Sequence, residues 1–128
     1  MPATVVDASA LAAVLFDEPE AAPILASVGG DLIAPGLIRY ELASVCATKC
    51  LRYPAHAVEI ETRYRLAAEL ALILREPDWE RLPGLARRWS LSACDAAYLQ
   101  LALVEGAPLV TLDVRLAHAY DAAARAKR

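Results

Sequence analysis

The chain has 128 residues and a formal net charge of −3, from 16 Asp and Glu against 13 Lys and Arg. This length is ordinary for one domain with a buried core, so we expect a single domain over residues 1–128. The sequence has no apolar run of about 18 residues and no basic segment leading into an apolar one, which excludes a membrane protein and predicts a cytoplasmic one. Three cysteines without metal-ligand spacing indicate reduced thiols rather than disulfides or a zinc site.

The first third of the chain alternates apolar strand patterns with helical ones. Thr4–Val6 is short and β-branched, which predicts a strand, and the apolar spacing over residues 8–16 predicts a helix. A second short helix is expected over residues 20–27, ended by Gly29 and Gly30. Leu32–Ala34 then predicts a short buried strand.

The middle of the chain predicts a helical hairpin. One helix is expected over residues 37–51 and a longer one from Pro54 to about Arg75, with apolar residues recurring on one side. Trp79–Leu82 is a plausible edge strand, and Pro83 and Gly84 begin a short helix that reaches Arg88.

The last third predicts two helices around one strand. The helix over residues 93–105 is apolar nearly all round, so we expect it to be buried, with Gly106 at its end. Leu109–Leu112 predicts a strand and residues 114–125 a final helix. Strands separated by helices predict a three-layer α/β domain with a short, mainly parallel sheet flanked by helices.

Four carboxylates lie where such a sheet would bring them together. Asp7 and Asp113 directly follow predicted strands, while Asp95 and Glu41 lie in the early turns of predicted helices. In a parallel sheet, the carboxyl ends of the strands and the N-termini of the following helices share one edge, where ligands bind. We therefore expect all four acids at one rim.

Glu41 faces inward on its predicted helix. At 100° per residue its side chain falls between Leu37 and Val45, so it enters an apolar face. A carboxylate there is costly without a partner. An ion pair with Lys49 or a nearby Arg is one explanation and a metal ion or metal-bound water is the other, and the sequence leaves both open.

Each of the other three acids has a local explanation as well. Ser92 to Asp95 spell S-x-x-D before an apolar run, which is a capping-box pattern. Asp113 can cap the helix that begins at Val114, and Asp7 can end its strand in an Asx turn. Taken singly, these explanations are favoured. They do not explain the convergence of like charges, which requires protons or cations.

A site made of carboxylates favours Mg²⁺, with Mn²⁺ as a substitute, over zinc or copper. Such an ion activates water and stabilises the charge that develops on a phosphate, so hydrolysis at phosphorus needs no side-chain nucleophile. The chain has no nucleophile elbow, Walker phosphate loop, Rossmann glycine fingerprint or HExxH motif. Without the four acids, 12 acidic residues face 13 basic ones, so the net charge does not argue against a nucleic-acid substrate.

Four segments carry a resemblance to a known family. They are VVDASAL, PGLIRYELASV, SLSACDAAYLQLAL and LVTLDVRLAHA, in the family's order and spacing. The chain resembles PIN-domain proteins over most of its length, and within that superfamily it resembles VapC-type toxins of bacterial toxin–antitoxin modules.

The resemblance implies a metal-dependent endoribonuclease toxin that cuts RNA to a 5′ phosphate and a 3′ hydroxyl. Its acidic quartet would be Asp7, Glu41, Asp95 and Asp113, with Asp7 and Asp95 as the firmest metal ligands. The resemblance also implies that the hydroxyls of two further residues support the site by hydrogen bonding to a carboxylate or bound water. These are Ser9 and Thr111, for which an N-cap and a plain strand residue are the alternatives.

The resemblance further implies a homodimer and a tight complex with a small VapB-type antitoxin. The antitoxin would cover the active site and supply the DNA-binding end, so DNA would be contacted only through it. The predicted hairpin offers apolar surface for such contacts.

The chain departs from the family pattern in two places. Cys94 stands where an aromatic or aliphatic residue is common, and we expect it to pack as a small apolar residue. No fifth strand is predicted after the last helix, and the chain ends in AAARAKR. The basic residues of that tail, Arg125, Lys127 and Arg128, are either solvated or in contact with RNA.

Other residues are less informative. His56 and His118 have no partner at ligand spacing, and Trp79 and Trp89 are expected to pack rather than to stack on bases. The candidate phosphate contacts are basic residues near the acid-bearing elements, for which a solvated surface is the alternative. They are Arg39, Lys49, Arg52 and Arg115.

Two other functions remain open. One is a catalytically weak PIN-fold binding module that represses its own operon together with a DNA-binding antitoxin. The other is a phosphoacceptor receiver domain, although the chain lacks the paired acids after the first strand and the late lysine of that class.

Overall fold

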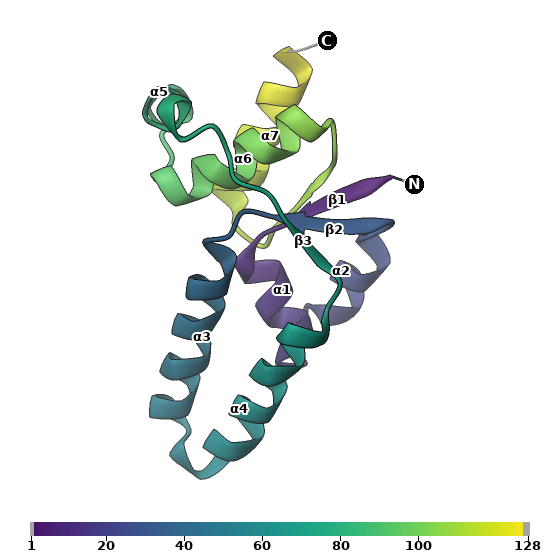
Figure 1. Ribbon diagram of the computed structural model, residues 1–128, viewed down its shortest axis with the longest axis vertical. Coiled ribbons are helices and arrows are strands. Elements are labelled where there is room, and N and C mark those ends of the chain that lie inside the picture. The colour runs from purple at the N-terminus through teal and green to yellow at the C-terminus, as the bar shows by residue number, and fades with distance from the viewer. Residues whose placement is uncertain (1, 127–128) are drawn as a thin grey trace.

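The computed structural model describes residues 2–126 and contains one sheet of four parallel strands in the order β3-β2-β1-β4 (Figure 1). The strands are β1 (Ala3–Val6), β2 (Asp31–Ala34), β3 (Leu72–Leu74) and β4 (Leu109–Val110). β1 is central because its β-branched residues are buried on both faces, Val5 being fully inaccessible to solvent. Val5 is in register with Ile33 of β2 and Leu109 of β4. This is the α/β architecture with a mainly parallel sheet that the sequence predicts.

Seven α-helices cover the two faces of the sheet. On one side lie α1 (Ala8–Leu15), α2 (Ala21–Ser27), α3 (Ile38–Arg52) and α4 (Ala57–Leu66), and on the other lie α5 (Leu82–Trp89), α6 (Ala93–Glu105) and α7 (Val114–Ala126) (Figure 1). α3 and α4 pack against each other and extend away from the sheet, which confirms the predicted hairpin.

The strand order reverses direction at β1. From β1 the chain moves to β2 and then to β3 through the helices of one face, and it returns from β3 to β4 on the other side of β1 through α5 and α6. The topological switch point of this sheet therefore lies between the carboxyl ends of β1 and β4. Ligand sites of parallel α/β sheets characteristically lie at such a point, so this is where a site is expected.

The buried helix α6 fills one side of the core, as its apolar pattern predicts. Residues 96–102 of this helix are all buried, and Leu99 and Tyr98 are among the largest fully buried side chains. Gly106 ends the helix with a φ of 61°, the left-handed conformation that a C-terminal glycine supplies.

Two predictions for the middle of the chain are wrong. The helix expected to reach Arg75 ends at Leu66, a 3₁₀ turn follows over Ala67–Glu69, and Leu72–Leu74 is the edge strand β3. The short apolar run there suits a strand as well as a helix, and pairing with β2 decides between them. The edge strand expected at Trp79–Leu82 is instead a 3₁₀ turn over Trp79–Arg81, followed at once by α5.

The segment after β3 is fixed by a buried amide rather than by sheet pairing. Gln100 of α6 is 7% exposed, accepts a hydrogen bond from the backbone N–H of Asp78 and donates one to the carbonyl of the same residue at 3.0 Å. Both backbone groups of Asp78 are thereby satisfied away from the sheet. This bond explains why the chain does not continue as a strand toward Trp79, whose side chain is 75% exposed.

Other expectations differ in smaller ways. Cys94 is exposed rather than packed, because it lies on the outer side of the first turn of α6, while Cys46 is buried and Cys50 half-buried in α3. Arg125 lies in the last turn of α7, and Lys127 and Arg128 lie outside the described residues. Among residues 2–126 no helix is long and apolar enough to cross a membrane.

Two glycines with positive φ give a test of how β1 is anchored. Gly106 has a φ of 61° and open space around it, so Gly106→Ala should cost about 1 kcal/mol in free energy of unfolding. Gly30 has a φ of 65°, and a Cβ there would clash with the carbonyl oxygen of Pro2, which accepts a hydrogen bond from Asp31. Gly30→Ala should therefore cost clearly more, as measured by urea unfolding of both variants. Equal losses would contradict this account of the β1–β2 contact.

Candidate metal centre

The site lies at the switch point of the sheet. Asp7 follows β1 and Asp113 comes shortly after β4, whose Val110 is in register with Val6. The backbone N–H of Asp7 donates to the carbonyl of Val110 at 3.2 Å, which fixes the end of β1 beside the end of β4. The two acids that the sequence places after strands are thus brought to neighbouring strand ends.

Asp7 is the most buried member of the group, at 5% exposure. It is the N-cap of α1, and its Oδ1 accepts hydrogen bonds from the backbone N–H of Ala10 at 3.0 Å and from the hydroxyl of Ser9 at 2.7 Å. Its Oδ2 accepts a hydrogen bond from the hydroxyl of Thr111 at 2.5 Å. Both carboxylate oxygens are therefore held, and the carboxylate is fixed in one orientation.

The hydroxyls that hold Asp7 also organise the segment after β4. The Ser9 Oγ accepts a hydrogen bond from the backbone N–H of Leu112 at 3.0 Å, and the Thr111 Oγ1 accepts one from the backbone N–H of Asp113 at 2.9 Å. Ser9 and Thr111 thus connect the carboxylate that follows β1 to the backbone that follows β4. These contacts are the hydrogen bonds to a carboxylate that the family resemblance implies, and their role in a reaction stays a prediction.

Glu41 is half-buried in the first turn of α3 and accepts a hydrogen bond at 2.5 Å from the hydroxyl of Tyr98. Tyr98 is 1% exposed, and its hydroxyl also takes part in a hydrogen bond with the backbone of Ala8. Burial and the contact with Glu41 raise the pKa of Tyr98, so its hydroxyl stays protonated as the donor. One phenol therefore joins α6, the start of α1 and the carboxylate of α3.

The other two acids begin helices, as their local sequence patterns predict. The Ser92 hydroxyl caps α6 by accepting from the backbone N–H of Asp95 at 3.1 Å. Asp113 caps α7, because its Oδ1 accepts from the backbone N–H groups of Arg115 at 2.9 Å and Leu116 at 3.2 Å. Capping and membership of an acidic group are therefore compatible, since the α6 cap uses only the backbone N–H of Asp95 and the α7 cap uses only one carboxylate oxygen of Asp113.

The acids affect one another's protonation. The pKa of Glu41 is raised mainly by burial and further by the charges of Asp7 and Asp95, against the hydrogen bond from Tyr98, which lowers it. The pKa of Asp95 is raised by burial and by the charges of Asp113 and Asp7, while Ser92 and Arg115 lower it. The charges of Asp7 and Asp113 thus act on Glu41 or Asp95, so electrostatic interactions connect the four acids into one group.

The group does not form a ready-made coordination shell. Among residues 2–126 no three Asp, Glu, His or Cys side chains are arranged so that they could hold a metal ion directly. The donor set nevertheless fits Mg²⁺, which keeps several of its waters and binds proteins through one or two carboxylates. Burial and, to a smaller extent, neighbouring carboxylates raise the pKa values of Glu41 and Asp95, and a divalent cation at the site would act in the opposite direction.

One sequence expectation for the surroundings is wrong, and the four candidate phosphate contacts lie in different places. Lys49 does not neutralise Glu41, because it pairs with Glu18 at 2.6 Å and lies over the ring of Phe16. Arg52 ends α3 roughly 16 Å along the helix from Glu41. Arg39 lines a cavity between α3 and α4. Arg115 is the candidate that the structure brings to the acids.

Sequence reasoning missed Tyr98. Its signal was a single tyrosine among small and aliphatic residues on a helix expected to be buried, since a buried phenol requires a hydrogen-bond partner. The partner could not be identified from sequence because Glu41 is 57 residues away.

Comparisons with known proteins identify the family and agree with the fold. The family model of the PIN domain matches residues 4–122. A crystal structure of PAE2754 from Pyrobaculum aerophilum superimposes with a TM-score of 0.66 at 19% sequence identity, covering 98% of this chain and 96% of that one, which is a likeness of fold. A comparison with curated proteins gave no significant match.

Because Glu41 lies close to other acids, we expect that removing its charge increases the free energy of unfolding. Because the pKa of Glu41 is raised in the folded state, the protein loses stability as the pH rises from the ordinary value of 4.5 through that raised pKa. Glu41→Gln keeps an acceptor for Tyr98 and removes the charge. With a chelator present, it should raise the free energy of unfolding by about 1 kcal/mol near neutral pH, and by less below the ordinary pKa of the carboxylate.

Thermal melts of wild type and Glu41→Gln at two pH values measure this difference. Glu69→Gln, at an exposed position of the 3₁₀ turn after α4, is the matched control and should leave the melting temperature unchanged. A Glu41→Gln protein that is less stable than wild type near neutral pH would show that the carboxylate is compensated within the protein.

Proposed function

The chain belongs to the PIN-domain family, and from this premise we propose that it is a metal-dependent endoribonuclease acting as the toxin of a type II toxin–antitoxin module. The family is associated with metal-dependent nuclease activity, which makes phosphodiester hydrolysis the expected chemistry. The observation that carries the proposal is the coupled group of Asp7, Glu41, Asp95 and Asp113 at the switch point of the sheet. The toxin role comes from the resemblance of the four acid-bearing segments to VapC-type toxins.

Mg²⁺ or Mn²⁺, when bound, would supply an activated water and stabilise charge on the scissile phosphate. Asp7 offers a rigid carboxylate because Ser9 and Thr111 hold both of its oxygens. Asp95, half-buried at the start of α6, is the least engaged acid and offers a more adjustable ligand. Glu41, with its raised pKa and the Tyr98 hydroxyl beside it, is suited to hold a proton near the reacting oxygens.

Asp95→Asn is the cleanest test of the reaction. Asp7→Asn would also disturb hydrogen bonds that hold α1 and β4, whereas Asp95→Asn keeps the Ser92 cap, which uses the backbone N–H of residue 95. The variant should stay folded and cleave RNA at a rate reduced by at least the roughly 100-fold typical of lost metal-site groups. Asp31→Asn is the control, because Asp31 is exposed at the opposite end of β2.

The measurement is cleavage of structured RNAs by antitoxin-free protein with magnesium, with manganese and with chelator, followed by mapping of the cut ends. Metal-dependent products with 5′ phosphates are expected from wild type and from the control. Cleavage by folded Asp95→Asn at the wild-type rate would refute the assignment.

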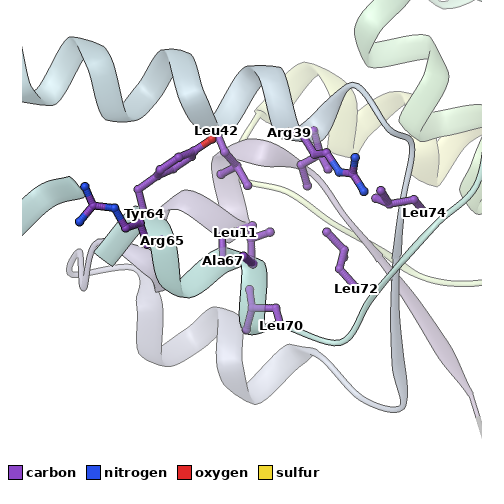
Figure 2. Close-up of a pocket in the computed structure, with 11 residues that line it drawn as sticks. Leu11, Arg39, Leu42, Tyr64, Arg65, Ala67, Leu70, Leu72 and Leu74 are labelled. Carbon is purple, nitrogen blue, oxygen red and sulfur yellow. The ribbon is translucent and has the colours of Figure 1, made fainter. Parts of the chain in front are cut away.

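The proposal includes a homodimer and a VapB-type antitoxin as partners. A cavity of about 530 Å³ lies between α3 and the α4–β3 segment and is lined mainly by apolar residues, among them Leu11, Leu42 and Leu70 (Figure 2). Arg65 and Arg39 lie toward opposite ends of it. An amphipathic antitoxin segment with acidic residues at its ends would match both the apolar lining and these charges.

The position of this cavity suits inhibition of the acid site. Arg39 and Glu41 belong to the same turn of α3, so a segment that fills the cavity reaches the vicinity of the acids. At the far end of the hairpin, Leu51 and Val58 are 84% and 81% exposed, which supports further protein contacts there.

The antitoxin assignment predicts that Leu70→Asp weakens inhibition without loss of cleavage. Leu70 lines the cavity and is already 39% exposed, so its replacement should leave the fold intact. RNA cleavage titrated with the cognate antitoxin should require at least about tenfold more antitoxin for the variant. Val104→Asp, at a 73% exposed position on α6, is the control. Equal inhibition of both variants and wild type would place the antitoxin elsewhere.

A further inference from the structure

Arg115 is an exposed arginine that the fold holds beside the acids. It lies in the first turn of α7, where its backbone N–H donates to the Oδ1 of Asp113 at 2.9 Å. Its guanidinium Nη2 donates to the backbone carbonyl of Ser90 at 3.1 Å. Both ends of the residue are therefore anchored, one to an acid of the group and the other to the connection between α5 and α6.

The anchor at Ser90 is itself tied to the site. Ser90 ends α5 with a φ of 54°, a left-handed conformation that serine rarely adopts, and its backbone N–H contacts the end of α5. The next two residues lead directly into the Ser92 cap of α6 and hence to Asp95. The guanidinium is thus held against the segment that leads to Asp95. The helix that carries Arg115, α7, begins at Asp113.

Arg115 interacts electrostatically with the acids but does not form an ion pair with them. It lowers the pKa of Asp95, so it lies within electrostatic range, yet within residues 2–126 it forms no ion pair with an acidic side chain. A guanidinium carries five N–H donors, and the carbonyl of Ser90 engages one nitrogen. Donors remain available toward solvent at the rim of the site.

We propose that Arg115 binds the phosphodiester backbone of RNA at the rim of the acidic site. This inference rests on the proposed function and identifies a binding residue for its substrate. An acidic rim repels a polyanion, so a fixed cation beside it is needed to hold the strand. The planar guanidinium fork matches two phosphate oxygens, whereas a lysine would supply a point charge alone.

The alternative role for Arg115 is to neutralise Asp95 within the protein. The two roles predict opposite results. A phosphate contact affects RNA binding and leaves metal binding unchanged, whereas a countercharge for Asp95 affects metal binding and leaves RNA binding unchanged.

The experiment compares wild type with Arg115→Gln, Arg115→Lys and Arg81→Gln. The side chain of Arg81 is 83% exposed just before α5, roughly 13 Å along that helix from Ser90, and Arg81→Gln matches the first substitution in charge. Glutamine at position 115 removes the charge and keeps a neutral N–H donor, and thermal melts check that the variants remain folded. RNA binding is measured with a fluorescently labelled single-stranded RNA in chelator over a series of salt concentrations, and Mn²⁺ binding is measured by electron paramagnetic resonance.

Arg115→Gln should weaken RNA binding about fivefold to tenfold and reduce the slope of log K against log salt by about 0.7, the value for one lost phosphate contact on a single strand. In cleavage assays KM should rise by a similar factor while kcat changes less. Arg115→Lys should recover part of the binding, and Arg81→Gln should resemble wild type. Mn²⁺ affinity should be the same in all four proteins.

Unchanged RNA binding and salt slope in Arg115→Gln, with tighter Mn²⁺ binding, would overturn the proposal in favour of the countercharge role. An equal loss in Arg81→Gln would overturn it as well, because the effect would then come from overall charge. These outcomes leave the proposed function intact if wild type cleaves RNA in a metal-dependent way. A wild type that neither binds nor cleaves RNA would overturn both.

Discussion

The buried carboxylate of Asp7 is the constraint on which the site depends. At 5% exposure it must be compensated, and the compensation comes from Ser9, Ala10 and Thr111, which belong to α1 and to the segment after β4. Because these donors come from parts of the chain about 100 residues apart, the same bonds that satisfy one charge fix two strand ends next to each other. The switch point is therefore stabilised by the hydrogen bonds to Asp7 and by the pairing of β1 with β4.

A second constraint is the set of like charges that this arrangement gathers. Glu41 and Asp95 both have raised pKa values, which means that the folded chain tolerates negative charge it would otherwise avoid. Tyr98 reduces the cost by donating to Glu41, but one neutral donor does not supply a countercharge. Sites in which clustered carboxylates lower the stability of the fold in this way are typical of cation-dependent catalysis.

Helix capping and the acidic site use the same residues for related reasons. A helix N-terminus attracts negative charge through its free N–H groups, so Asp7 and Asp113, which cap α1 and α7, and Asp95, in the first turn of α6, are stable there. A parallel sheet brings these helix starts to one edge, and the three acids then converge without further adjustment. In the sequence, helix capping and a shared metal site are alternative explanations for these acids. In the structure, the preference of acids for helix starts is one reason why the shared site forms.

The sequence alone determined the helices and strands with strong local signals, including α6 with its Gly106 end and the order of acids after β1 and β4. It also determined the family, because four acid-bearing segments occur in one order. The edge strand was decided by tertiary structure, since Leu72–Leu74 is apolar in either conformation and only pairing with β2 selects the strand.

Tertiary structure also decided which residues distant in the chain become hydrogen-bond partners. Glu41 required a partner, but only the fold, which brings Tyr98 of α6 to the start of α3, makes that partner Tyr98 rather than Lys49. The tether from Arg115 to Ser90 likewise depends on the three-dimensional path of the chain between α5 and α6. Local patterns specify which groups need compensation, whereas the sheet order specifies which groups provide it, because long-range contacts form only when the strands have been arranged.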